Sequence, residues 1–263
     1  MLSSKFFLFL PQPTLKLWVE KVSALAVHLL TSLGILCSLF AMLCIFEDKI
    51  ANAFLWLGCA LLIDAVDGTL ARIVGVDQIV PNISGLMMDS IVDFINYIFI
   101  PALLLVKGEY LLPQLELILP GIILIISLFS YSKVSVYDAD FRYVGFPVAW
   151  NIVLVYLFIF EPGQFLNSII IITFIILKFI PLKYVQPFRT KKFRHLTLVA
   201  TTFWFLSAIS LCLNKLIPLN AYLIVFAMSS LGLSSIYFVC LTIASVFENF
   251  TLKLHPLTNL KKF

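Results

Sequence analysis

The sequence contains very little charge. Only 12% of its 263 residues are Asp, Glu, Lys or Arg, whereas 62% are hydrophobic and the mean hydropathy is +1.07. A soluble domain carries about twice that share of charged residues, so the composition excludes an ordinary water-soluble fold. The net charge of +4 forms no basic stripe along the chain, which argues against a nucleic-acid surface.

Paired cysteine motifs are also missing. The five cysteines, Cys37, Cys44, Cys59, Cys212 and Cys240, lie singly in apolar segments without the CxxC spacing of zinc or redox sites. We therefore expect them to be small buried hydrophobic side chains. Neither a disulfide framework nor a zinc site is predicted.

Long apolar runs dominate the rest of the chain. A helix needs roughly 20 apolar residues to cross a hydrocarbon layer about 30 Å thick. The runs predict an all-α integral membrane protein, a polytopic bundle of about eight transmembrane helices that forms one domain over residues 1–263. The expected spans are 23–46, 50–70, 84–106, 113–136, 146–160, 165–181, 194–214 and 219–248.

Charge placement predicts how the chain is oriented. The segment Leu15–Val22 separates apolar from charged side chains, which predicts an N-terminal interfacial helix on the membrane surface. Of the 18 Lys and Arg residues, only Lys49, Lys107 and Lys215 fall on the side opposite the N-terminus. Since positive residues collect in cytoplasmic loops, both termini are expected in the cytoplasm.

Four aspartates, Asp64, Asp67, Asp89 and Asp93, lie at or inside the ends of the second and third expected spans. An uncompensated charge there is unfavourable by about 3 kcal/mol or more. On helices, Asp64 and Asp67 are three residues apart, and Gly85, Asp89 and Asp93 follow at intervals of four, so each span turns two carboxylates to one face. Two such helices would enclose oxygen ligands for Mg²⁺ or Mn²⁺, and four carboxylates can hold two ions that clamp a phosphoryl group.

Gly68 and Arg72 extend this acidic set. Glycine permits a close backbone approach to a phosphate, and Arg72 can offer two parallel hydrogen bonds to phosphate oxygens. Two alternatives stay open at this point. The acids can simply be paired or solvated, as we expect for Asp77, or they can mark the cation or proton pathway of a transporter. A transport pathway leaves Gly68 and Arg72 unexplained.

The stretches DAVDGTLAR (64–72) and GLMMDSIVD (85–93) resemble the signature of the CDP-alcohol phosphotransferase (phosphatidyltransferase) superfamily. Twelve residues separate Arg72 from Gly85, a longer spacer than is common there. With AVHLLTSLG (26–34), VGFPVAWNIVLVYLF (144–158) and FIPLKYVQPFR (179–189), this spacer resembles the bacterial phosphatidylcholine synthase branch. The similarity spans most of the chain, and the loop SVYDADFRYVGFP departs from it.

The resemblance implies transfer of a phosphatidyl group from CDP-diacylglycerol to choline, with release of CMP, in a bacterial inner (cytoplasmic) membrane. It implies a homodimer and two divalent cations, Mn²⁺ or Mg²⁺, with the active site on the cytoplasmic side. Carried over by position, the resemblance gives one ion the ligands Asp64, Asp67 and Asp89, and the other ion the ligands Asp64, Asp89 and Asp93. It also makes Asp93 the general base. The pocket for CDP and its phosphates would contain Gly68, Arg72 and Gly85.

A quaternary ammonium group such as that of choline is recognised by aromatic faces. The aromatic candidates, with one polar neighbour, are Tyr97, Tyr143, Phe146, Trp150 and Asn151. With 25 Phe, nine Tyr and four Trp in the chain, a packing role stays open for each aromatic residue. Serine or glycerol 3-phosphate is the alternative acceptor, and either would require an additional cationic pocket.

His28 stands alone on an apolar helix. An isolated histidine in such a place is expected to be structural, and Thr31 or Ser32 is the expected hydrogen-bond partner.

Overall fold

A computed structural model describes residues 12–132, 143–144, 149–180, 183–184 and 193–254, with side chains over 16–132, 149–180 and 193–244. The elements in chain order are α1 (Gln12–Phe46), α2 (Ile50–Val74), α3 (Val76–Ile79), α4 (Gly85–Phe94), the π-helix η1 (Ile95–Phe99), α5 (Ile100–Lys107), the 3₁₀ turn η2 (Pro113–Leu115), α6 (Ile118–Tyr131), β1 (Tyr143–Val144), α7 (Trp150–Phe160), α8 (Gln164–Phe179), β2 (Lys183–Tyr184), α9 (Arg194–Asn214) and α10 (Ala221–Leu254). The expected helical architecture is confirmed. One addition is a two-residue antiparallel ladder, which pairs Tyr143 with Tyr184.

Six of the described segments are long and apolar enough to cross a membrane: Lys16–Phe46, Ile50–Val74, Gly85–Lys107, Pro113–Tyr131, Arg194–Asn214 and Ala221–Ala244. The prediction of about eight spans is therefore supported for six. The expected spans 146–160 and 165–181 are the shorter helices α7, of 11 residues, and α8, of 16. An 11-residue helix is about 16 Å long, well short of the hydrocarbon thickness. α7 stops at Glu161, whose φ of 47° is left-handed, immediately before Pro162.

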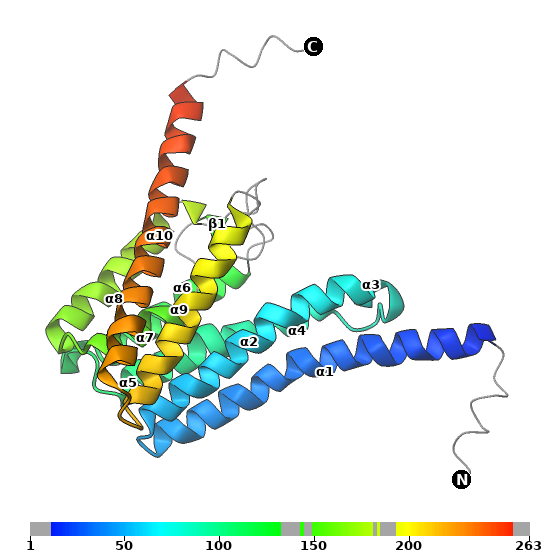
Figure 1. Ribbon diagram of the computed structural model, residues 1–263, viewed down its shortest axis with the longest axis horizontal. Coiled ribbons are helices and arrows are strands. Elements are labelled where there is room, and N and C mark those ends of the chain that lie inside the picture. The colour runs from blue at the N-terminus through cyan, green and yellow to red at the C-terminus, as the bar shows by residue number, and fades with distance from the viewer. Residues whose placement is uncertain (1–11, 133–142, 145–148, 181–182, 185–192, 255–263) are drawn as a thin grey trace.

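The expected interfacial segment Leu15–Val22 is helical but is not a separate helix. It forms the first turns of α1, which runs without interruption for 35 residues. A helix of that length extends about 52 Å, so it is longer than the hydrocarbon layer is thick. α1 accordingly projects past the other helices toward its N-terminal end (Figure 1).

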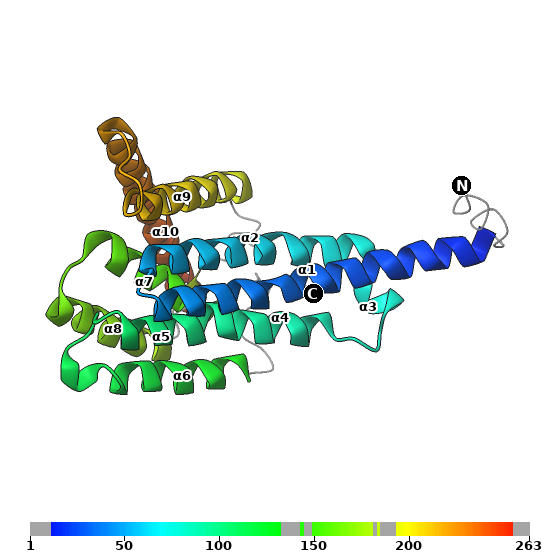
Figure 2. The same cartoon turned by 90° about the horizontal axis from the view of Figure 1, so that it is seen from below.

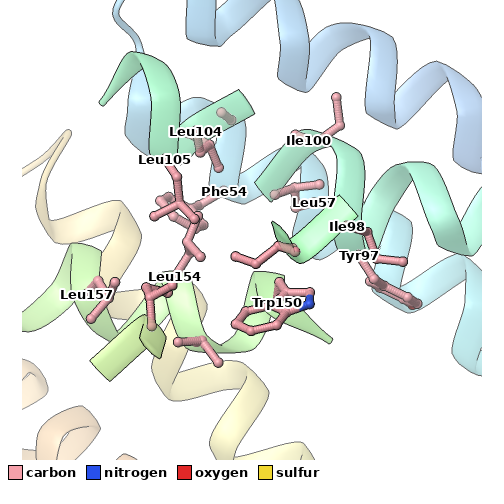
Figure 3. Close-up of a cluster of buried hydrophobic side chains, with 14 of the residues drawn as sticks. Phe54, Leu57, Tyr97, Ile98, Ile100, Leu104, Leu105, Trp150, Leu154 and Leu157 are labelled. Carbon is pink, nitrogen blue, oxygen red and sulfur yellow. The ribbon is translucent and has the colours of Figure 1, made fainter. Parts of the chain in front are cut away.

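Helices α1, α2 and the continuous unit formed by α4, η1 and α5 run side by side, and α6 lies beyond that unit (Figures 1 and 2). α9 and α10 form a second pair, inclined to the first group. The main hydrophobic core lies between α2, η1, α5 and α7 and includes Phe54, Ile98, Leu104 and Leu154 (Figure 3). This packing fixes η1, and with it the end of α4, against α2.

Local signals define the turn between α2 and α4. Gly75 ends α2 in the left-handed conformation, with a φ of 73°, and its N–H donates to the Ala71 carbonyl at 2.9 Å. Val76 of the short helix α3 is buried against Ala24 and Val27 of α1. Ser84 then caps α4, because its hydroxyl accepts a hydrogen bond from the Met87 N–H at 3.2 Å.

Candidate metal site

Three carboxylates meet where α2 faces α4. Asp64, Asp89 and Asp93 each offer an oxygen, and these oxygens all lie within 4.8 Å of one another. All three side chains are half-buried. Three like charges at this separation repel strongly in a low-dielectric surrounding, and a bound cation relieves that repulsion. The set fits a hard divalent ion because every donor is an oxygen. The predicted meeting of carboxylates from the two spans is confirmed for these three residues.

Asp67 occupies a different position from the other three. It is 4% exposed, on the turn of α2 that follows Asp64, and the Thr31 side chain of α1 lies beside its carboxylate. It is not one of the three residues whose oxygens come within 4.8 Å of one another. The fourth predicted ligand is therefore held at the α1 side of the site.

A polar clamp joins α1 to the helix that carries Asp89 and Asp93. Asn96 is buried, its amide donates to the Gly34 carbonyl at 3.3 Å, and its oxygen accepts from the Ser38 hydroxyl at 2.7 Å. Gly34 makes this approach possible, since a Cβ there would lie 2.5 Å from a methyl carbon of Val92. The clamp sets the distance between α1 and α4 at the level of the acids.

The π-helical turn η1 begins two residues after Asp93. Such turns are rare and are often found at functional sites. Within η1, Tyr97 is 8% exposed and its hydroxyl donates to an Asp64 oxygen at 2.6 Å. This bond ties the carboxylate of α2 to the helix that carries Asp93. It also orients one of the three clustered carboxylates.

Gly68 and Arg72 lie together on the last turns of α2. A Cβ on Gly68 would have one neighbour within 4 Å, a guanidinium nitrogen of Arg72 at 3.6 Å. Arg72 is exposed and donates to the Thr69 hydroxyl at 3.1 Å. The guanidinium thus flanks the uncovered backbone of Gly68, one helical turn beyond Asp64.

Gly85, the first residue of α4, faces α1 and α3. A Cβ there would lie 3.3 Å from Cε1 of His28 and 3.8 Å from an oxygen of Asp77. The expectation that Thr31 or Ser32 would bind His28 is wrong. Both hydroxyls donate to carbonyls of their own helix, and the buried Nε2 of His28 has no partner among the described residues.

The five residues predicted to bind the acceptor fall in different places. Tyr97 reaches the acidic cluster. Trp150 is 1% exposed in the main core, and its indole N–H donates to Ser127 at 3.2 Å (Figure 3). Asn151 lines a cavity of about 30 Å³ with residues of α2 and α9, among them Gly58 and Trp204. Tyr143 belongs to β1, and its side chain, like the whole of Phe146, lies outside the described residues.

Several residues near the acids were missed by sequence reasoning. Phe94 follows Asp93 directly, and its ring meets that of Tyr131 from α6 edge-to-face, with centroids 5.9 Å apart. Thr31 lies beside Asp67, and Asn96 binds α1 to the helix that carries Asp93. Only their polarity within apolar spans signals them in the sequence, because their partners are distant along the chain.

Comparisons with known proteins agree with a metal-binding acidic site of the phosphatidyltransferase kind. No protein-family model matches the chain. The chain is 35% identical over 190 residues to a phosphatidylcholine synthase of Pseudomonas aeruginosa, covering 72% of this chain and 80% of that protein. It is 32% identical over 195 residues to a phosphatidylcholine synthase of Mesorhizobium japonicum, covering 74% and 73%. It is 30% identical over 229 residues to a phosphatidylcholine synthase of Borreliella burgdorferi, covering 87% and 95%. With an acidic oxygen cluster at its centre and relatives of one kind across most of its length, the chain belongs to the phosphatidylcholine synthase family.

Proposed function

We propose that this chain transfers the phosphatidyl group of CDP-diacylglycerol to choline, giving phosphatidylcholine and CMP. The observation that carries the proposal is the meeting of Asp64, Asp89 and Asp93 in a membrane-embedded bundle whose relatives are phosphatidylcholine synthases. Carboxylates so placed suit divalent cations, which offset the negative charge of a diphosphate. Serine or glycerol 3-phosphate stays the alternative acceptor.

Two divalent cations, Mg²⁺ or Mn²⁺, are proposed at the acids. One would be held by Asp64, Asp67 and Asp89 and the other by Asp64, Asp89 and Asp93. When bound, such ions offset the negative charge of the diphosphate and stabilise the leaving CMP. The clustering of Asp64, Asp89 and Asp93 supports this assignment, and Asp67 lies on the next turn of α2.

Asp93 is proposed as the general base. It takes the proton of the acceptor hydroxyl, whose oxygen attacks the lipid-linked phosphorus as the bond to CMP breaks. Asp93 lies in α4 just before η1, and Phe94 and Tyr97 follow it toward the membrane interior. The hydrogen bond from Tyr97 to Asp64 holds a neighbouring carboxylate in place, so that Asp93 and Asp64 keep a fixed separation.

Gly68, Arg72 and Gly85 are proposed to receive the diphosphate and the nucleotide. The guanidinium of Arg72 flanks Gly68, where no side chain blocks a phosphate. Arg72 then binds phosphate oxygens through its fork of N–H donors. Gly85 lies at the beginning of α4, where His28 packs closely against it.

Choline is proposed to bind beside Asp93, because its hydroxyl must reach that carboxylate. Tyr97 is the acceptor-site candidate that the described contacts favour, and the edge-to-face pair of Phe94 and Tyr131 adds aromatic surface next to it. A desolvated quaternary ammonium gains about 1 to 2 kcal/mol from each such ring. Tyr143 and Phe146 stay proposed members of the acceptor site, whereas Trp150 is buried in the main core and Asn151 lines a cavity between α2 and α9.

The proposed setting is one membrane domain over residues 1–263 in a bacterial inner membrane, assembled as a homodimer. Its termini and acids face the cytoplasm. The bias of Lys and Arg toward one side of the bundle supports that orientation. Soluble CMP, choline and metal ions are then available to the same face.

The direct test uses purified protein in lipid nanodiscs with CDP-diacylglycerol and Mn²⁺ or Mg²⁺. Choline, serine and glycerol 3-phosphate are added separately, and both CMP release and the lipid product are measured. We expect CMP release that requires choline, forms phosphatidylcholine and stops when EDTA removes the metal. Release that requires serine or glycerol 3-phosphate would reassign the acceptor, and no release with any alcohol would reject the transfer reaction.

A further inference from the structure

Two aromatic rings from different helices meet beside Asp93. Phe94 follows that carboxylate in α4, and Tyr131 is the last residue of α6. Their ring centroids lie 5.9 Å apart, and the ring planes are perpendicular. Both side chains are half-buried, so part of each is accessible to a ligand. Phe94 and Tyr131 therefore form an aromatic corner next to the proposed general base.

Tyr97 links this corner to the acidic cluster. Its hydroxyl donates to Asp64 at 2.6 Å, and it lies close enough to Tyr131 for the two phenol groups to interact electrostatically. Tyr131 is thus near both aromatic residues that follow Asp93 along the chain, Phe94 and Tyr97. The aromatic corner and the carboxylates belong to one site.

The turn of α6 that precedes Tyr131 is fixed from the core. Ser127 lies one turn earlier on the same helix face and is fully buried, and its hydroxyl accepts a hydrogen bond from the Trp150 indole at 3.2 Å. α6 also packs against α4 and η1. Tyr131 therefore stands on a turn that is held on both sides, and Trp150 contributes to the corner through Ser127.

α6 ends at the aromatic corner. Ser132 closes the helix, since its N–H and its hydroxyl both donate to the Leu128 carbonyl, at 3.0 Å and 2.9 Å. The C-terminal end of a helix carries a partial negative charge of about half a unit, which favours a cation within the last turn and disfavours an anion. The backbone at Tyr131 thus adds to the attraction that the ring faces have for a cation.

This arrangement matches the chemistry of one acceptor. The hydroxyl and the ammonium of choline are two carbons apart, so a hydroxyl within reach of Asp93 places the ammonium at the corner. A trimethylammonium group has no N–H to donate, and aromatic faces attract it. A primary ammonium has three N–H donors that would lose their water there, and serine and glycerol 3-phosphate each bring an anionic group. We propose that Phe94 and Tyr131, at the end of α6, select choline by binding its methylated ammonium, an inference that rests on the proposed function.

The first test separates charge from shape. In 3,3-dimethylbutan-1-ol a carbon replaces the nitrogen of choline, so the molecule has the same shape without the charge. Tyr131→Leu and Phe94→Leu are assayed in nanodiscs with CDP-diacylglycerol and Mn²⁺, with the neutral alcohol as a competitor of choline. We expect the KM for choline to rise about ten-fold in each variant. The inhibition constant of the neutral alcohol should change by about two-fold or less, and the KM for CDP-diacylglycerol should stay unchanged.

A conservative variant and a control complete this test. Tyr131→Phe keeps the ring face and should keep the KM for choline within about two-fold of wild type. Tyr222→Leu removes an aromatic ring that is 86% exposed on α10 and should change neither constant. An unchanged KM for choline in both leucine variants would overturn the proposal, and so would equal losses for choline and the neutral alcohol. If Tyr131→Leu does not fold, the same comparison in Phe94→Leu decides.

Direct binding distinguishes this proposal from the proposed reaction. Choline affinity is measured by calorimetry with CMP and Mn²⁺ present. If wild type releases no CMP with any alcohol but binds choline, and Tyr131→Leu binds it about ten-fold more weakly, the transfer reaction is wrong and choline recognition stands. If choline-dependent release occurs but the leucine variants keep the wild-type KM for choline, the reaction stands and the aromatic corner is wrong. Release that requires serine or glycerol 3-phosphate would overturn both.

Discussion

The third and the last of the six spans are similar in length and hydropathy but differ in how deeply they are buried. In the most apolar stretch of Gly85–Lys107, 50% of the residues are buried inside the protein, against 17% for Ala221–Ala244 in α10. Both sequences are hydrophobic enough to cross a membrane. Hydropathy alone therefore does not distinguish the span that forms the site from a span at the edge.

The polar groups of the two spans explain the difference. The third span carries Asp89, Asp93 and Asn96, which need partners from other helices. The polar contacts described for α10 involve hydroxyls: Ser235 donates to the Leu231 carbonyl of its own helix, and Tyr237 pairs with Thr197 of α9. Hydroxyls can satisfy themselves on their own helix, whereas carboxylates in hydrocarbon require protein or ions around them.

The largest expected effect is that of Asp93→Asn in the buried span. Loss of a general base should lower kcat by about 100- to 10,000-fold, while CMP binding with Mn²⁺ is largely retained. Steady-state CMP release and calorimetry measure the two quantities. Asp48→Asn is the control, and near-normal turnover of the Asp93 variant would refute the base assignment.

Tyr97→Phe is expected to have the next largest effect. It keeps the ring and removes the 2.6 Å hydrogen bond to Asp64. A hydrogen bond to a charged group contributes about 1.5 to 3 kcal/mol, so kcat/KM should fall about ten-fold or more. Tyr222→Phe, on the exposed face of α10, should leave kcat/KM unchanged. Equal activity of the two variants would show that the bond does not support catalysis.

Two glycine substitutions compare packing in the two regions directly. In Gly34→Ala the new Cβ would lie 2.5 Å from Val92, so we expect the free energy of unfolding to fall by about 1 to 3 kcal/mol. Gly232→Ala in α10 meets no atom within 4 Å and should raise helix stability by up to about 1 kcal/mol. Thermal unfolding in detergent measures both. Similar shifts of the same sign would contradict the difference in packing.

The smallest effect is expected for Ser235→Ala in α10. It removes the contact of Ser235 with the Tyr156 hydroxyl, although Trp204 still donates to that hydroxyl at 2.6 Å. We expect unfolding stability to fall by about 0.5 to 1 kcal/mol without any loss of activity. Ser229→Ala, at an exposed position of the same helix, is the control for stability. A drop in turnover would mean that α10 takes part in the site.

Much of the site could be predicted because its signals are local. Intervals of three and four residues place Asp64, Asp89 and Asp93 on helix faces, and these three meet as expected. Asp67 stands apart from these three and beside Thr31, which lies more than thirty residues earlier in the chain. The missing partner of His28 likewise reflects how α1 meets α3 and α4, and periodicity within one helix carries no information about such contacts.

The ends of the helices likewise separate into those that local sequence signals explain and those that they do not. The end of α2 follows from Gly75, and the beginning of α4 follows from Ser84. By contrast, the fusion of Leu15–Val22 with α1 and the shortness of α7 were not predicted, because amphipathic and apolar patterns do not fix how far a helix continues.

By itself, the sequence determined that this chain is a helical membrane protein with an acidic phosphoryl-transfer signature, since composition and helical spacing are properties of the chain alone. Only the tertiary structure decided that Asp67 stands apart from the other three aspartates, that Tyr97 binds Asp64, and that His28 and Asp77 flank Gly85. Those contacts join different helices, and the distance between two helices is set by the small and polar residues at their interface.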